Sequence, residues 1–173
     1  HLFLPALALA RRVRRLRLSV IAAPGPAAYA RALAAQIDEL GLADVVRMEG
    51  AVERPELRQR FAHADALLFH SVFGEPVAQV MLHAAASGLP VVGPASMDTR
   101  SLLQDEVTAT CYGTHSAEAV ADAVLRGLAS AEARRARAER LYIAVRDHHN
   151  LADTVARYDA LLCERAGASL RSM

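Results

Sequence analysis

The sequence predicts a Rossmann-like α/β domain, in which a parallel sheet is covered by helices on both faces and followed by a C-terminal helical tail. Short apolar segments of strand length alternate with longer segments whose apolar residues recur at helical spacing. The connections between them are short, and the last third of the chain shows helical spacing alone. The 173 residues suit one compact domain.

The first elements follow from composition and turn residues. Leu2–Val13 has the pattern of a short helix, and Leu16–Ala22 is an apolar, partly β-branched segment typical of a strand. The strand ends at the turn Ala23–Pro26. Ala27–Leu40 repeats its large apolar residues at helical spacing, and Gly41 is placed to end that helix.

The middle of the chain repeats this alternation. Val45–Met48 is a second short strand, and Pro55–Ala62 is a helix with proline at its first position. Ala66–His70 is apolar without alternation, which predicts a strand buried on both faces. Pro76–Ser87 is the next helix, and Gly88 can take the left-handed conformation that stops it.

The last predicted strands are Pro90–Val92 and Val107–Tyr112. After them the chain is helical, and Asn150 is placed to cap the final helix. The expected C-terminal helices are Ala117–Leu128, Ala131–Val145 and Leu151–Glu164.

Composition excludes several classes of function. All 20 basic residues are arginine, so the chain has no lysine for a GxxxxGK phosphate loop or a Schiff base. The net charge of +1 gives no bulk electrostatic reason to bind nucleic acid. Cys111 and Cys163 have no metal-ligand spacing, so we expect free thiols in a reducing, cytoplasmic environment and no metal. No apolar segment approaches the ~20 residues of a membrane span.

The helix at Pro76–Ser87 carries the polar residues that need explaining. Glu75 precedes its first turn, beside the positive end of the helix dipole. Gln79 and His83 are four residues apart and share a face away from the apolar stripe of Val77, Val80, Met81, Ala84 and Ala85. One interpretation is that Glu75 is a helix-start carboxylate and His83 a polar residue at the core edge. The other is that both contact an elongated ligand.

Three longer segments carry a resemblance to a known family. They read GLADVVRMEGAV (Gly41–Val52), ELRQRFAHADALLFHS (Glu56–Ser71) and EPVAQVMLHAAASGLPVV (Glu75–Val92). In order and spacing they resemble the C-terminal, donor-binding domain of GT-B retaining glycosyltransferases of the glycosyl transferases group 1 family. SAEAVADAVLRGLAS (Ser116–Ser130) is similar to the helix that follows in that family. The match covers nearly the whole chain.

The resemblance implies a two-domain enzyme whose donor is a nucleoside-diphosphate sugar. Residues 1–173 would then form a single nucleotide-sugar-binding domain, inactive alone, in a fragment that lacks the N-terminal acceptor-binding domain. Glu75 matches the first glutamate of the E-x7-E motif, which lies near the sugar, and is the expected catalytic residue. The other expected contacts to the nucleotide sugar are His83, Gln79, Val77, Ala78, Val52, Arg54, Gly50 and Ser71.

The sequence also departs from the family pattern. His83 replaces the second glutamate, which bonds the ribose hydroxyls, and a neutral imidazole accepts only one hydrogen bond. Val77 and Ala78 replace Phe-Gly, and Pro94–Ser96 replaces a Gly-Gly loop. The arginine and lysine that clamp the diphosphate would lie upstream of His1.

We therefore expect transfer of a glycosyl group, with retention, from a nucleoside-diphosphate sugar and without a further cofactor. Two alternatives are a non-catalytic module that binds nucleotide or protein and a nucleotide-sugar epimerase of the same architecture. Peripheral membrane association is expected only through the full-length enzyme. Arg11–Arg17 fits either a solvated helix end or a contact to anionic lipid or phosphate, and His70 fits either a ligand contact or a hydrogen-bonded loop histidine.

Overall fold

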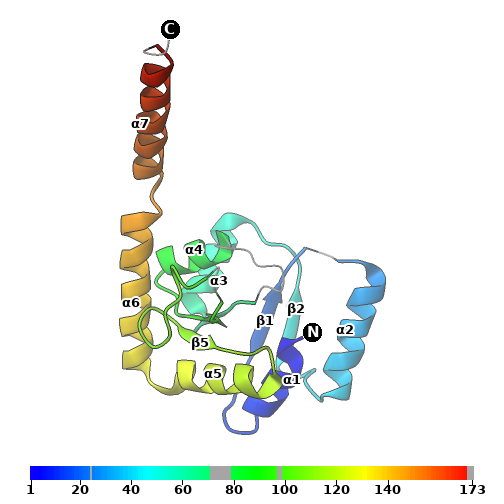
Figure 1. Ribbon diagram of the computed structural model, residues 1–173. Coiled ribbons are helices and arrows are strands. Elements are labelled where there is room, and N and C mark those ends of the chain that lie inside the picture. The colour runs from blue at the N-terminus through cyan, green and yellow to red at the C-terminus, as the bar shows by residue number, and fades with distance from the viewer. Residues whose placement is uncertain (24, 71–78, 97–98, 171–173) are drawn as a thin grey trace.

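The computed structural model describes residues 1–23, 25–70, 79–96 and 99–170, in which strands and helices alternate before a helical end (Figure 1). This α/β architecture with parallel strands confirms the predicted fold class. The strands are β1 (Leu18–Ile21), β2 (Val46–Glu49), β3 (Leu67–Leu68), β4 (Val91–Pro94) and β5 (Thr110–Tyr112). The helices are α1 (Phe3–Ala10), α2 (Ala27–Glu39), α3 (Arg54–His63), α4 (Gln79–Ala86), α5 (Ala117–Ala129), α6 (Ala131–His148) and α7 (Leu151–Leu170).

Hydrogen bonds divide the described strands into two parallel groups rather than the single sheet that we predicted. β1 pairs with β2, with Leu18 opposite Val46, and β4 lies between β3 and β5. Side chains connect the two groups of strands. Leu16, just before β1, packs with apolar residues of α1 and α2 and also with apolar residues of α1 and α5. Leu67 and Leu68 of β3 pack with the core on the two faces of β4, and they are half-buried, although we predicted that this strand is buried on both faces.

The β3–β4–β5 group has the predicted helical layer on each face. Val91 packs with residues of α3, α4 and α6, whereas Val92, its neighbour in β4, packs with α1 and α5. Successive side chains of a strand point to opposite faces, so β4 is completely buried between the two layers. This strand is the centre of the core.

Among the described residues, an apolar cluster covers one face of the β1–β2 pair. Leu4, Leu7, Leu33 and Ile37 of α1 and α2 pack with Leu18 and Val46. Ser19 lies opposite Arg47, and Ile21 opposite Glu49, on the other face. This face carries polar residues, and Arg60 of α3 pairs with Glu49 on it.

Two glycines end helices as predicted. Gly41 and Gly88 have φ of 63° and 70°, in the left-handed region that glycine adopts without a Cβ clash. After Gly88, the Leu89 amide donates to the Ala84 carbonyl at 2.9 Å, while the Gly88 amide donates to Ala85 at 3.0 Å. These two bonds form a Schellman motif, and Leu42 and Gly41 repeat it at the end of α2.

Several predicted elements are shorter in the structure, among them β1, expected over Leu16–Ala22, and β3, expected over Ala66–His70. The first helix ends at Ala10 instead of Val13, because the next amides bond in tight turns to Leu9 and Ala10. The fifth strand begins at Thr110 instead of Val107, because Glu106 adopts a φ of 57° in a turn and its amide donates to the Ala109 carbonyl. The last helix is longer than predicted and runs to Leu170.

Helix α7 extends away from the body of the molecule (Figure 1). Every described side chain from Leu151 to Arg165 is exposed. Asn150 caps this helix as predicted, because its side-chain oxygen accepts from the Asp153 amide at 2.8 Å.

Candidate functional site

The carboxyl ends of the strands form the edge at which open parallel sheets bind ligands. The connections that leave this edge are the segments after Ile21, Glu49, Leu68, Pro94 and Tyr112. Helix N-termini also point their amides toward this edge, which suits anionic groups. The candidate residues that we predicted fall on the second and third of these connections and on the helix after the third.

Five of the nine predicted contact residues lie in the described part of the chain. Gly50 and Val52 follow β2, Arg54 is the first residue of α3, and Gln79 and His83 belong to α4. The remaining four, Ser71, Glu75, Val77 and Ala78, lie outside the described residues.

Helix α4 separates its apolar and polar residues. Met81, Ala84 and Ala85 are completely buried and pack against β4 and α6, as the predicted apolar stripe requires. Gln79 and His83 are exposed, one helical turn apart. His83 is therefore outside the core, which leaves its imidazole free to contact another molecule.

The segment after β2 is held by an ion pair beside the predicted contacts. Arg60 of α3 lies 2.8 Å from the Glu49 carboxylate, whose side chain is 11% exposed. The same guanidinium meets Glu56 at 2.9 Å. This pair joins the last turn of α3 to the end of β2, on either side of the connection that contains Gly50 and Val52. Gly50 and Arg54 are exposed and Val52 is half-buried.

His70 is held by Tyr112 across the carboxyl ends of β3 and β5. The Tyr112 hydroxyl donates to the Phe69 carbonyl at 2.9 Å, and the same oxygen lies 2.9 Å from His70 Nδ1. Tyrosine has a single hydroxyl proton, so Nδ1 must be the donor to Tyr112. His70 Nε2 is then a buried acceptor without a hydrogen-bond partner in the described part of the chain. Of the two interpretations of His70, the structure shows the hydrogen-bonded one.

His115 completes this group, although nothing in the sequence singled it out. Its ring lies 4.7 Å from that of His70, centroid to centroid, and 5.9 Å from that of Tyr112. Burial lowers the pKa of His70, and the charge of His115 lowers it further. Burial also raises the pKa of Tyr112. The only sequence signal was position, since all three residues end or follow a strand.

Hydroxyl groups of Ser96 and Thr99 form hydrogen bonds after β4. Thr99 is 1% exposed, and its Oγ1 donates to the Pro94 carbonyl at 2.8 Å and meets Ser96 Oγ at 3.0 Å. A side chain at Gly93 would approach Leu103 to 2.9 Å, so the strand passes close to the following segment. These hydroxyl bonds hold Thr99 close to the carboxyl end of β4, at the predicted site edge.

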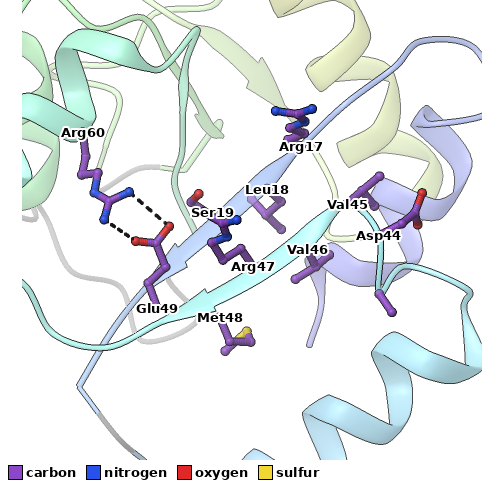
Figure 2. Close-up of a pocket in the computed structure, with 11 residues that line it drawn as sticks. Arg17, Leu18, Ser19, Asp44, Val45, Val46, Arg47, Met48, Glu49 and Arg60 are labelled. Atoms are coloured by element: carbon purple, nitrogen blue, oxygen red, sulfur yellow. Dashed lines mark hydrogen bonds and ion pairs between the residues drawn. The ribbon is translucent and has the colours of Figure 1, made fainter.

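The hollow shown in Figure 2 lies away from the predicted contact residues. It measures about 660 Å³ and is lined by Arg17–Ser19, by Ala43–Glu49 and by Arg60. Its lining comes from the polar face of β1 and β2 and from the start of each strand, and it contains none of the residues that we predicted to bind the donor. We therefore do not assign it to the candidate site.

Among the described residues, no group of three His, Cys, Asp or Glu side chains is placed to hold a metal ion. Within the same residues no helix is long and apolar enough to span a membrane. Cys111 is buried and Cys163 exposed, and both are free thiols.

Comparison with protein families identifies one match. The family model of glycosyl transferases group 1 matches residues 1–130. That span contains every strand, α1 to α5, and every residue predicted to contact the donor. A comparison with curated proteins finds no significant match.

Solved structures share the fold at low sequence identity. Sucrose-phosphate synthase from Thermosynechococcus elongatus has a TM-score of 0.82 at 22% identity, over 96% of this chain and 43% of that one. HepE of Anabaena, in complex with UDP-glucose, has a TM-score of 0.76 at 21% identity, over 84% of this chain and 40% of that one. The chain thus spans about two fifths of the length of these relatives.

A third structure is the C-terminal domain of LpcC, a glycosyl transferase group 1 family protein from Francisella tularensis. Its TM-score is 0.72 at 17% identity, over 87% of this chain and 78% of that one. At such identities the likeness shows the fold, which is that of the Rossmann-like domains of GT-B glycosyltransferases.

Proposed function

The chain belongs to the glycosyl transferases group 1 family, and on that premise we propose that it is the donor-binding half of a retaining glycosyltransferase. The enzyme would transfer a hexose-like sugar from a nucleoside diphosphate to an acceptor. The acceptor-binding half would be an N-terminal domain of the same protein, and the full-length enzyme would work in the cytoplasm with peripheral contact to a membrane. The TM-score of 0.72 to a C-terminal domain of the same family supports the assignment to this half.

The observation that carries the proposal is the placement of Gln79 and His83. Both are exposed on α4, the helix that follows β3, while Met81, Ala84 and Ala85 of the same helix pack into the core. In the family pattern this helix carries the E-x7-E motif, with His83 at its second position. We propose that Gln79 and His83 line the ribose of the donor and that Glu75 lies beside its sugar.

The remaining proposed contacts follow the same pattern. Departure of a nucleoside diphosphate develops negative charge, which backbone amides at a helix N-terminus and cationic side chains stabilise. We assign the amides to Val77, Ala78 and Gln79 and the cations to arginines supplied from outside this chain. Gly50, Val52 and Arg54 would contact the nucleobase, and Ser71 the donor. No metal or further cofactor is part of the proposal.

His83 also supports a second candidate function. A histidine in place of the second glutamate offers fewer hydrogen-bond acceptors to a ribose and so weakens the donor site. The second candidate is therefore a non-catalytic module of the same fold that binds nucleotide or protein. The two functions differ in whether the full-length protein transfers sugar.

Calorimetric titration of the full-length protein with UDP-, GDP- and ADP-linked sugars tests the donor site. We expect one of the three to bind. If none binds a folded sample, the transferase proposal is wrong. If one binds but no acceptor is glycosylated, the non-catalytic module is correct. The anomeric configuration of any product, measured by NMR, tests retention, and an inverted product contradicts it.

A variant pair tests the role of His83. We expect His83→Glu to tighten donor binding about tenfold, because a carboxylate accepts two charge-assisted hydrogen bonds from a ribose. Ala86→Glu places the same charge at another exposed position of α4 and is the matched control. Equal effects of the two variants would mean that His83 does not contact the ribose.

A further inference from the structure

The net charge of +1 conceals a strong separation of charge along the chain. The first 37 residues contain six arginines and no aspartate or glutamate. The remaining residues contain 14 arginines and all 19 acidic residues. Such asymmetry is typical of proteins that meet an anionic surface with one end. Five of the six early arginines lie between Arg11 and Arg17, a segment that we call the arginine connector.

The arginine connector joins α1 to β1 and is fixed at two points. Arg11 pairs with Asp44 at 3.0 Å, and Arg14 donates to the Leu128 carbonyl at 2.6 Å. These contacts tie the backbone to the ends of α2 and α5, so the connector presents its other side chains from a fixed position.

Three arginines of the connector are unused by the fold. Arg12, Arg15 and Arg17 are exposed, and their side chains make no hydrogen bond or ion pair with the described residues. Val13, between Arg12 and Arg14, is 75% exposed. The connector therefore presents free guanidinium groups around an apolar side chain, a combination that serves neither packing nor local pairing.

Arg47 extends this surface onto the sheet. It lies opposite Ser19 on the polar face of β1 and β2, and Arg17 precedes Ser19 by two residues, so both arginines are on one face. Figure 2 shows Arg17 and Arg47 along the strands and Glu49 paired with Arg60. Arg47 makes no ion pair with the described residues, and the neighbouring carboxylates Glu49 and Asp44 are already paired.

We propose that the arginine connector and Arg47 together dock this protein on a membrane rich in anionic lipid. Guanidinium groups bind phosphate and carboxylate headgroups, and Val13 can enter the interface between them. This surface lies at the amino-terminal ends of the strands, at the opposite edge from the candidate site. Docking there leaves the site open to a water-soluble donor.

A membrane fits this surface better than a nucleic acid. Single-stranded nucleic acids bind proteins by stacking on aromatic side chains, and none occurs in Arg11–Arg17. Duplexes are read by a helix or strand in a groove, whereas the connector has neither structure. The acidic remainder of the chain would also repel a long polyanion.

Vesicle sedimentation with the full-length protein tests the proposal. The probes are vesicles of equal parts phosphatidylglycerol and phosphatidylcholine, with phosphatidylcholine alone for comparison. We expect binding to the anionic vesicles only, and loss of that binding as salt rises from about 0.05 M to about 0.5 M. The triple variant Arg12→Gln/Arg15→Gln/Arg17→Gln should partition roughly a hundredfold more weakly. It spares Arg11 and Arg14, so its thermal midpoint should stay unchanged.

The matched control removes the same charge elsewhere. Arg58, Arg135 and Arg157 are exposed on three other helices and form no ion pair with the described residues, so their replacement by glutamine should leave vesicle binding unchanged. Equal loss in both triple variants would show attraction by net charge alone and overturn the docking surface. Binding to single-stranded RNA without vesicle binding would also overturn it.

This inference extends the peripheral membrane contact of the proposed function, but the two fail separately. Vesicle binding is measured without a nucleotide sugar, and donor binding is measured without vesicles. A protein that binds donor and not vesicles retains the transferase proposal and loses the docking surface. A protein that binds vesicles and not donor retains the docking surface and loses the transferase proposal.

Discussion

The guanidinium of Arg137 donates to the carboxylate of Glu106 at 2.6 Å, from a side chain that is 7% exposed. The other oxygen of the same carboxylate accepts from Arg126. Arg137 Nη2 is buried and has no hydrogen-bond partner among the described residues. Glu106 thus provides the counter-charge for a buried cation.

The first prediction concerns the asymmetry of this pair. Glu106→Gln should cost about 2 kcal/mol of unfolding free energy, because it leaves the buried guanidinium without a counter-charge. The loss stays this small because the Glu106 carboxylate is half-exposed to solvent. Arg137→Met should cost less, because it removes the buried charge and keeps the packing volume. Urea denaturation at pH 7 measures both. Asp122→Asn, which removes an exposed partner of Arg126, is the control and should be nearly neutral. A larger loss in Arg137→Met would contradict the asymmetry.

A second prediction concerns the close contact between α5 and the sheet. A methyl group at Gly127 would lie 2.9 Å from Val92 Cγ2 and 3.4 Å from Thr110 Oγ1. Gly127→Ala should therefore lose about 1–3 kcal/mol by overpacking, which exceeds the gain of about 1 kcal/mol in helix propensity. In a double-mutant cycle, Val92→Ala should relieve most of this loss. Additive losses would show that the contact is not with Val92.

A third prediction follows from the lowered pKa of His70. Its folded pKa is depressed, chiefly by burial, so the unfolded chain binds the proton more readily. The stability contribution is complete above the unfolded pKa of about 6.5 and is lost as pH falls through the folded value. His70→Leu should therefore flatten the decline in unfolding free energy between about pH 7.5 and pH 5. Parallel curves for the variant and the parent protein would exclude His70 as the titrating group.

Thiol chemistry gives a fourth prediction. Burial, reinforced by the charge of Asp105, raises the pKa of Cys111 to about 11, whereas Cys163 is exposed. In the native protein we expect an aromatic disulfide reagent at about pH 8 to modify one thiol rapidly, and both thiols only after denaturation. Cys163→Ser should abolish the rapid phase. A rapid phase that survives in Cys163→Ser would mean that Cys111 is accessible.

The sequence predicted best those features that neighbouring residues decide. Gly41 and Gly88 stop their helices because the left-handed conformation is a property of the glycine backbone. Asn150 caps α7 through a bond to a residue three positions later. The apolar stripe of α4 followed from its period alone, and its described members are at least partly buried.

Contacts between distant residues could not be predicted in the same way. The His70–Tyr112 bond joins positions 42 residues apart, and the Glu106–Arg137 pair joins positions 31 apart. Each depends on how strands and helices pack, which no local spacing encodes. The candidate site lies between these two cases in how well the sequence predicts it. The family pattern selected His83, and the structure added that its side chain is exposed.

Helix α1 packs against α5, so residues near the start of the described chain meet partners that are translated roughly a hundred residues later. A ribosome adding about 5–20 residues per second needs about 5–20 s to make that stretch. During this interval the apolar segment FLPALALA has no α5 to cover it. Until α5 is made, the nascent chain therefore carries an apolar helix without this partner, and this is where we expect a co-translational chaperone to bind.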